Sequence, residues 1–142
     1  GNITPDNRIT FAFTSSIDWK LAEDFHLLWA AARAEHAPDL VQLYINHLSV
    51  GMDAYEYIGN PQLKSEINYQ TDLKLVKRWE KVSFSVDGFV SYLNNYITAE
   101  VNQNIPRKFL PCKEPKYTKQ FTNIDEALMT GFETTLDIKF LR

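Results

Sequence analysis

The sequence predicts a single α+β domain, in which an αα-hairpin and further helices pack on one face of a small, mostly antiparallel sheet. The chain of 142 residues has the length of one ordinary domain. Its apolar residues recur two positions apart in some segments and three or four apart in others, so that both strands and helices are expected. These elements do not alternate strictly, which argues against a doubly wound parallel sheet.

A strand and a long helix are predicted at the start of the chain. Apolar and polar residues alternate over residues 8–14, which is the period-two pattern of a half-buried strand. Over residues 16–36 the spacing becomes helical, and Ser15 or Ser16 can cap the first turn. The helical stripe consists of Ile17, Leu21, Phe25, Leu28, Trp29 and Ala32. The pattern therefore predicts an amphipathic helix over this range.

A second helix is predicted to follow directly and to pair with the first. Pro38 suits the first turn of a helix, and the sequence "GNP" at 59–61 ends the pattern. The stripe of this helix consists of Leu40, Tyr44, Leu48, Gly51 and Tyr55. The two helices would form an αα-hairpin hinged at residues 35–38.

The second half of the chain gives shorter elements and one ambiguous segment. Residues 62–82 first alternate like a strand and then show helical spacing, so both structures stay open, and we favour a strand that leads into a short helix. A helix is predicted over residues 86–104, with Pro106 as its end. After a loop punctuated by prolines, the patterns predict a strand in "KYTKQFT", a short helix in "NIDEALMTGF" and a closing strand in "TTLDIKFLR".

Composition favours a cytoplasmic protein without a membrane span. The longest strictly apolar run, "LLWAAA", is far shorter than the roughly 20 residues of a membrane-spanning helix. The single cysteine, Cys112, cannot form an internal disulfide, which suits a reducing compartment. Secretion stays open, because Gly1 resembles the remnant of a removed tag and an upstream signal could have been cut away with it.

All three histidines lie within residues 25–48, which raises the question of a metal or catalytic site. In the predicted hairpin His26 and His47 share a height, but at about 100° per residue they point in different directions. Two imidazoles that point apart do not bind one metal ion. His36 falls at a helix C-terminus, where a cation is favourable. The histidines are therefore predicted to be structural, and neither a metal nor a cofactor is expected.

Glu100 lies near the centre of the apolar stripe of the predicted helix 86–104. A carboxylate desolvated there would have a raised pKa and could act as a general acid or base. An exposed Glu100 is the simpler interpretation, because charged residues are rarely buried without a partner. An enzyme that uses Glu100 or His47 on a small molecule is therefore kept as an alternative, with no catalytic residue assigned.

The segment "PRKFLPCKEPKYTKQF", residues 106–121, has the most distinctive local chemistry. Its five cations outnumber its one carboxylate, and aromatic residues lie between them. Such a segment can hold a phosphate backbone or an acidic protein surface. A solvated loop that needs charge for solubility is the simpler account, and the sequence pI of about 5.6 argues against nucleic acid. The candidate binding residues are Arg107, Lys108, Lys113, Lys116, Tyr117 and Lys119.

The leading functional hypothesis from the sequence is a soluble, non-catalytic module that binds a protein partner. Residues 1–60 are acidic and residues 61–142 mildly basic, so the partner could be a second copy of the chain in a homo-oligomer. The alternatives are the small-molecule enzyme and a binder of nucleic acid or another polyanion through residues 107–119.

Overall fold

The computed structural model describes residues 8–109 and 115–140, and these residues form a mostly β structure. Strands hold 68% of them and helix only 4%. The prediction of an α+β domain with helices packed on one face of a sheet is therefore wrong.

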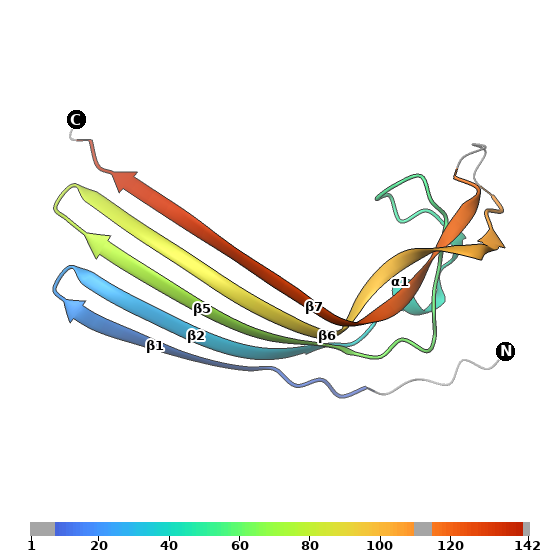
Figure 1. Ribbon diagram of the computed structural model, residues 1–142, viewed down its shortest axis with the longest axis horizontal. Coiled ribbons are helices and arrows are strands. Elements are labelled where there is room, and N and C mark those ends of the chain that lie inside the picture. Colours follow the sequence, from blue (N-terminus) through green and yellow to red (C-terminus); the bar gives the residue numbers. More distant parts are fainter. Residues whose placement is uncertain (1–7, 110–114, 141–142) are drawn as a thin grey trace. The chain divides into compact units, whose positions relative to one another are not determined.

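Seven strands and one short helix follow one another along the described residues (Figure 1). They are β1 (Phe13–Ala22), β2 (Phe25–His36), α1 (Leu40–Tyr44), β3 (Asn46–Leu48), β4 (Tyr57–Ile58), β5 (Glu66–Arg78), β6 (Val82–Pro106) and β7 (Tyr117–Ile138). The strands form one sheet in the order β1-β2-β5-β6-β7-β4-β3. Within the described ranges, no helix is both long and apolar enough to cross a membrane.

The chain divides into two compact units, which are described separately. The first, here named the loop unit, consists of Gly1–Ile9, His36–Ile67 and Asn94–Glu126. The second, here named the strand unit, consists of Thr10–Glu35, Asn68–Leu93 and Ala127–Arg142. Strands β5, β6 and β7 contribute residues to both units.

The residues predicted as one helix over 16–36 form the β1–β2 hairpin. The two strands pair antiparallel, with Ile17 opposite Trp29. A spacing of four residues fits a strand as well as a helix, because it is twice the strand period and close to one helical turn. The predicted stripe combined Ile17 and Leu21 with Phe25 across the turn, and it left out Trp19, which belongs to the same alternating series.

The other predicted helices are wrong as well. Phe89, Leu93 and Ile97 are four residues apart and lie in the long strand β6. The second arm of the predicted αα-hairpin contains only the five residues of α1 and the short strands β3 and β4. The strand expected in "KYTKQFT", the helix expected after it and most of the closing strand together form one strand, β7.

The strand unit has two chemically different faces. Side chains alternate between the faces of a strand, so the odd-numbered residues of β1 share one face and the even-numbered residues share the other. The first set includes Phe13, Ile17, Trp19 and Leu21, all exposed, and the second set includes Thr14, Ser16, Asp18 and Lys20. In the part of β7 that belongs to this unit, the even-numbered apolar residues Leu128, Phe132, Leu136 and Ile138 are exposed, and Met129 is the exposed apolar residue of the other parity. We name these surfaces the apolar face and the polar face.

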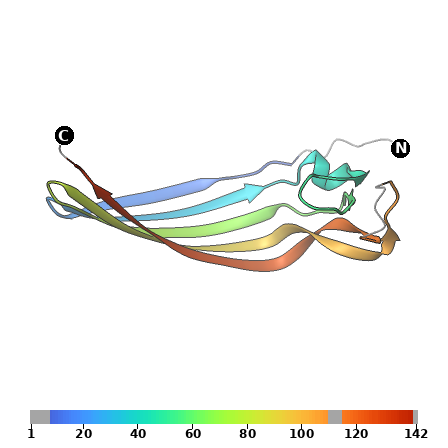
Figure 2. The ribbon, with the colours of Figure 1, turned by 90° about the horizontal axis from the view of Figure 1, so that it is seen from above.

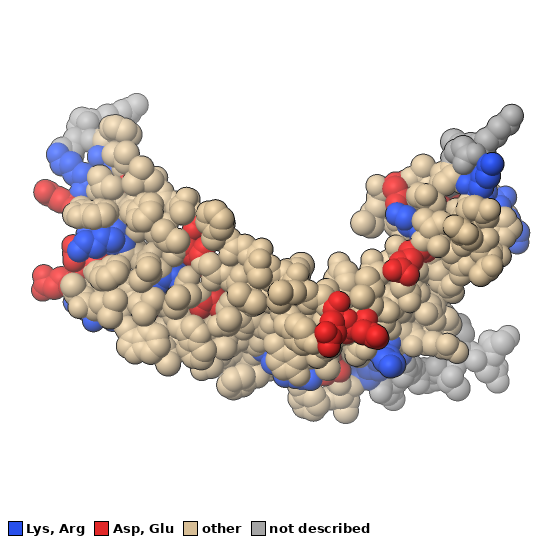
Figure 3. Space-filling model, in the orientation of Figure 1, with Lys and Arg blue, Asp and Glu red and all other residues tan. Residues whose placement is uncertain are grey.

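The five long strands of the strand unit lie side by side in one layer (Figures 1 and 2). Figure 3 shows basic (Lys or Arg) and acidic (Asp or Glu) residues gathered where the short turns connect the strands, and a mostly uncharged surface along the strands next to them. Among the described residues of the strand unit, the buried side chains are Val76, Ser91 and Leu93. A single sheet layer leaves its side chains exposed unless another surface covers them.

The loop unit has a small apolar core beneath α1. Leu43, Leu63 and Ile97 are buried together, and Phe121 packs against them. A capping box begins the helix, because the Asp39 side chain accepts from the Gln42 amide and the Gln42 side chain accepts from the Asp39 amide. Strand β4 pairs in parallel with β7 and antiparallel with β3, so that the connection between β2 and β5 is held against β7.

Replacing Gly59 by alanine is expected to displace α1. An added Cβ would lie 2.5 Å from the carbonyl carbon of Leu43 and from the amide nitrogen of Tyr44. Backbone atoms cannot move aside by a rotamer change, so the helix must shift, at a cost of about 1–3 kcal/mol. Thermal unfolding should show the loss. In the control Gly88→Ala the nearest atom is 3.9 Å away, and little change is expected. Equal losses in both variants would contradict this account.

Candidate functional site

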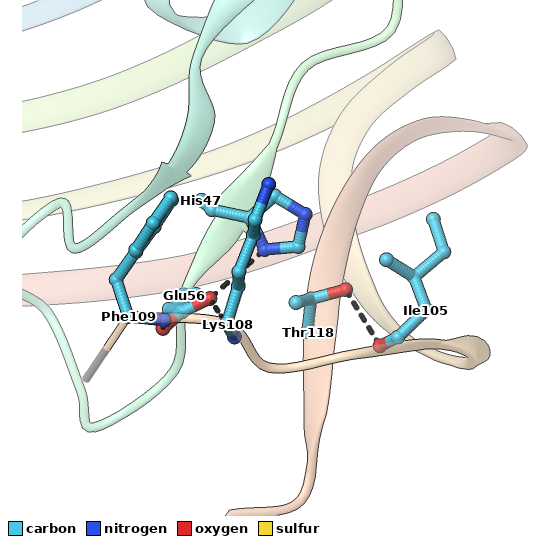
Figure 4. Close-up of polar contacts among 6 residues, drawn as sticks. All are labelled: His47, Glu56, Ile105, Lys108, Phe109 and Thr118. Carbon is cyan, nitrogen blue, oxygen red and sulfur yellow. Dashed lines mark hydrogen bonds and ion pairs between the residues drawn. The ribbon is translucent and has the colours of Figure 1, made fainter. Parts of the chain in front are cut away.

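Glu56 holds the start of the connection between β6 and β7. Its side chain is fully shielded from solvent, and one of its oxygens, Oε2, lies 2.9 Å from His47 Nδ1. The same oxygen accepts the amide of Lys108 at 2.7 Å, and Oε1 accepts the amide of Phe109. Figure 4 shows these groups converging on the carboxylate. We name the group formed by Glu56, His47 and the two amides the Glu56 anchor.

The Glu56 anchor compensates for the burial of a charge. A buried carboxylate is costly unless donors surround it, and here three donors do so. The Phe109 ring also meets the His47 ring edge to face, with centroids 6.0 Å apart. Beside the anchor, the hydroxyl of buried Thr118 donates to the carbonyl of Ile105 at 3.1 Å. Both ends of the connection are thereby fixed to the loop unit.

A second polar group fixes the segment before β4. The Lys119 ammonium pairs with Asp53, and the Tyr57 hydroxyl donates to the same carboxylate at 3.0 Å. The ammonium also lies 4.7 Å from the centre of the Tyr55 ring. Burial alone would raise the pKa of the Asp53 carboxyl, but hydrogen bonds from Lys119, the Tyr55 amide and the Tyr57 hydroxyl outweigh it and lower that pKa.

The Asp53 contacts are expected to weaken in acid. Because the folded-state pKa of Asp53 is lowered, its contribution is fully present above the ordinary aspartate pKa of about 3.9 and is lost as the pH falls through the folded value. Hydrogen exchange at the Tyr55 amide, corrected for its intrinsic pH dependence, should accelerate in that window. In Lys119→Met the acceleration should be smaller and should begin at higher pH. An unchanged profile in that variant would contradict the assignment.

The predicted binding residues fall into three groups. Lys108, Lys116 and Tyr117 are exposed, and Arg107 is half-buried with its amide donating to the Lys116 carbonyl at 3.0 Å. Lys119 is committed to Asp53. Lys113 lies outside the described residues, as does Cys112. The structure therefore brings the backbone of Arg107 close to that of Lys116. Because Lys119 pairs with Asp53, it is not among the exposed cations of the basic segment.

The other candidate residues are dispersed. His26 pairs with Asp18 at 3.1 Å in the strand unit, whereas His47 belongs to the loop unit. His36 is exposed, and so is Glu100, which lines an amide-rich cavity of about 340 Å³. Among the residues that the structure describes, no group of three His, Cys, Asp or Glu side chains could hold a metal ion. No pattern in the sequence indicated Glu56, the side chain that holds the backbone of the basic segment at Lys108 and Phe109.

Comparison with known proteins identifies the family. The family model described as "TonB dependent receptor-like, beta-barrel" matches residues 3–141. The chain belongs to the TonB-dependent receptor-like β-barrel family. No curated protein matches this family member.

Solved structures share the fold of this TonB-dependent receptor-like chain. The siderophore receptor PirA from Pseudomonas aeruginosa matches with a TM-score of 0.65 and 20% identity over 87% of this chain and 24% of its own. The copper transporter OprC matches with a TM-score of 0.66 and 18% identity, over 90% of this chain and 18% of the transporter. The ferric enterobactin receptor PfeA from Pseudomonas aeruginosa matches with a TM-score of 0.62 and 22% identity, over 87% of this chain and 19% of the receptor. The chain thus spans a quarter or less of these structures.

Membership of the TonB-dependent receptor-like family corrects several predictions. A soluble protein-binding module, a small-molecule enzyme and a nucleic-acid or polyanion binder are all overturned, and so are a homo-oligomeric partner and a cytoplasmic location. The prediction of no membrane span considered only helices, which need about 20 apolar residues. A membrane strand needs about 9–11 residues with only every second one apolar, so it leaves no long apolar run in the sequence.

Proposed function

We propose that the chain is part of an outer-membrane receptor that imports a metal chelate and has TonB as its partner. The observation that carries the proposal is the alternation of exposed apolar and polar side chains along the strands of the strand unit. In a transmembrane barrel, lipid takes the apolar side and the lumen takes the polar side. Strands β1 and β2 have 10 and 12 residues, which suits the hydrocarbon thickness that such strands must cross.

The lengths of the connections give the orientation. The turns after β1 and β5 are short, whereas residues 37–65 and 107–116 form long connections. Outer-membrane barrels have short periplasmic turns and longer extracellular loops. The two long connections would then face the outside of the cell, where the ligand arrives.

The exposed part of the basic segment is the proposed ligand contact. Lys108 and Lys116 are exposed, and exposed Phe109 and Tyr117 stand next to them in the sequence. Cations beside aromatic rings suit an anionic metal chelate, because charge attracts the ligand and the rings supply contact area. The named relatives support this class of ligand, since two are receptors for siderophores or ferric enterobactin and one transports copper.

The test is uptake of radioactive iron, supplied as ferric enterobactin, or of copper by cells whose only receptor of this family is the full-length protein. The double variant Lys108→Gln/Lys116→Gln is expected to need a substrate concentration about tenfold higher for half-maximal uptake, which corresponds to the loss of about 1.4 kcal/mol of binding. Lys64→Gln removes an exposed charge from the same unit outside the segment and should leave uptake unchanged. Uptake of neither substrate by the unmodified receptor would overturn the proposal.

A further inference from the structure

We propose that the strand unit binds the headgroup of an anionic phospholipid at the end where short turns connect its strands. The inference rests on the proposed membrane location. A cavity of about 500 Å³ lies where β5, β6 and β7 end or begin, and three of its lining residues are the cations Arg78, Lys81 and Lys139. Asp137 is the one carboxylate among its lining residues. The cavity therefore has a positive balance of charge.

The three cations differ from Lys74 and Lys77 of β5, because no described carboxylate forms an ion pair with them. Lys77 pairs with Asp24 at 2.6 Å, and Lys74 pairs with Asp87 at 3.4 Å. Arg78, Lys81 and Lys139 form no ion pair with any carboxylate in residues 8–109 and 115–140. Cations gathered around a cavity without such partners attract a phosphate group.

Backbone hydrogen bonds hold the cations near one another. The Lys139 amide donates to the Lys81 carbonyl at 2.8 Å, which ties the end of β7 to the start of β6. The Trp79 amide donates to the Val82 carbonyl at 2.7 Å and closes the turn between Arg78 and Lys81. The site is therefore built on the ends of paired strands.

The apolar lining of the cavity identifies the ligand as a lipid. Val82 and Ile138 line it, and they share strand faces with exposed Phe84 and Leu136, two residues away on the apolar face. An acyl chain could continue along this face while the phosphate meets the cations. Trp79, 53% exposed, also lines the cavity, and tryptophan prefers the level of the headgroups. A free phosphate ion would use the cations but not the apolar wall.

The test compares lipids retained by the full-length receptor in native mass spectrometry, after incubation with equal amounts of phosphatidylglycerol and phosphatidylethanolamine. We expect the unmodified receptor to retain phosphatidylglycerol in several-fold excess and Arg78→Gln/Lys81→Gln/Lys139→Gln to retain the two lipids about equally. The control Lys20→Gln/Lys64→Gln/Lys74→Gln removes the same charge outside the cavity and should keep the excess. An excess that survives in the first variant would overturn the proposal.

Two further measurements separate the remaining explanations. Displacement of phosphatidylglycerol by an equal concentration of water-soluble glycerol phosphate would overturn the lipid assignment, because that competitor has no acyl chain. Protease protection in lipid vesicles, measured first for every variant, reports insertion and folding. Failure of the unmodified receptor to insert would contradict the proposed function, whereas insertion without lipid preference would contradict only the headgroup site.

Discussion

Replacing Glu56 by alanine is expected to release the backbone of Lys108 and Phe109 from the segment that precedes β4. The substitution leaves the His47 imidazole and two backbone amides without their acceptor in a place that water does not reach. Losing one partner of a buried charged group costs about 3–5 kcal/mol. The opening is local, so hydrogen exchange at the Lys108 and Phe109 amides should accelerate by a factor of 100 or more, which corresponds to about 3 kcal/mol.

Two variants make this result specific. Glu56→Gln keeps one side-chain oxygen as an acceptor but turns an NH₂ group toward the remaining donors, so its exchange rates should lie between those of the alanine variant and the unmodified protein. Glu100→Ala removes an exposed carboxylate from the same unit and should leave both amides protected. Unchanged exchange in Glu56→Ala would show that the Glu56 anchor does not hold the connection.

Replacing Phe132 by lysine is expected to destabilise the membrane-inserted protein by about 2–4 kcal/mol. Phe132 is 83% exposed on the apolar face, near the middle of the part of β7 that belongs to the strand unit. A lysine there must place its charge in hydrocarbon or distort the bilayer around it. Urea unfolding from lipid vesicles measures the loss, which should appear as a lower denaturation midpoint with an unchanged slope.

Thr135→Lys is the matched control for this substitution. Thr135 is also exposed on β7, but it lies three positions after Phe132, and an odd number of positions along a strand places it on the opposite, polar face. A lysine there would face the lumen, and a change within about 0.5 kcal/mol is expected. Equal losses in the two variants would contradict the assignment of the faces and, with it, the proposed location in the membrane.

The sequence contained the alternation that defines the strand unit, but spacing alone was ambiguous. Ile17, Leu21 and Phe25 satisfy the helical period and also every second step of a strand. The residues that separate the two readings are Trp19 and Leu27, which fit only the strand period and lie opposite each other in the β1–β2 pair. The helical interpretation was chosen because the chain was assumed to be a soluble domain, in which apolar residues lie in a core. A single-layer sheet with an exposed apolar face does not fit that assumption.

The site was less accessible to prediction than the strands. The loop punctuated by prolines was predicted correctly at residues 107–109 and 115, and its residues 110–114 lie outside the described part of the chain. Glu56, however, binds amides 52 and 53 residues further along the chain, and nothing near it in the sequence indicates those partners. Lys119 looked available for a ligand because its partner, Asp53, is 66 residues away. Contacts of this range depend on the parallel pairing of β4 with β7, which one sequence does not reveal.

That parallel pairing constrains how the protein can evolve. Surface connections usually diverge independently of one another, which lets a receptor acquire new ligands by changing one loop at a time. Here β4 lies in the connection between β2 and β5, yet it pairs with β7, and the Lys119 amide donates to the Glu56 carbonyl. An exchange of residues 107–116 for the corresponding loop of a relative should therefore succeed only when residues 46–58 are transferred with it. The connection between β2 and β5 and the connection between β6 and β7 are therefore expected to change together in evolution.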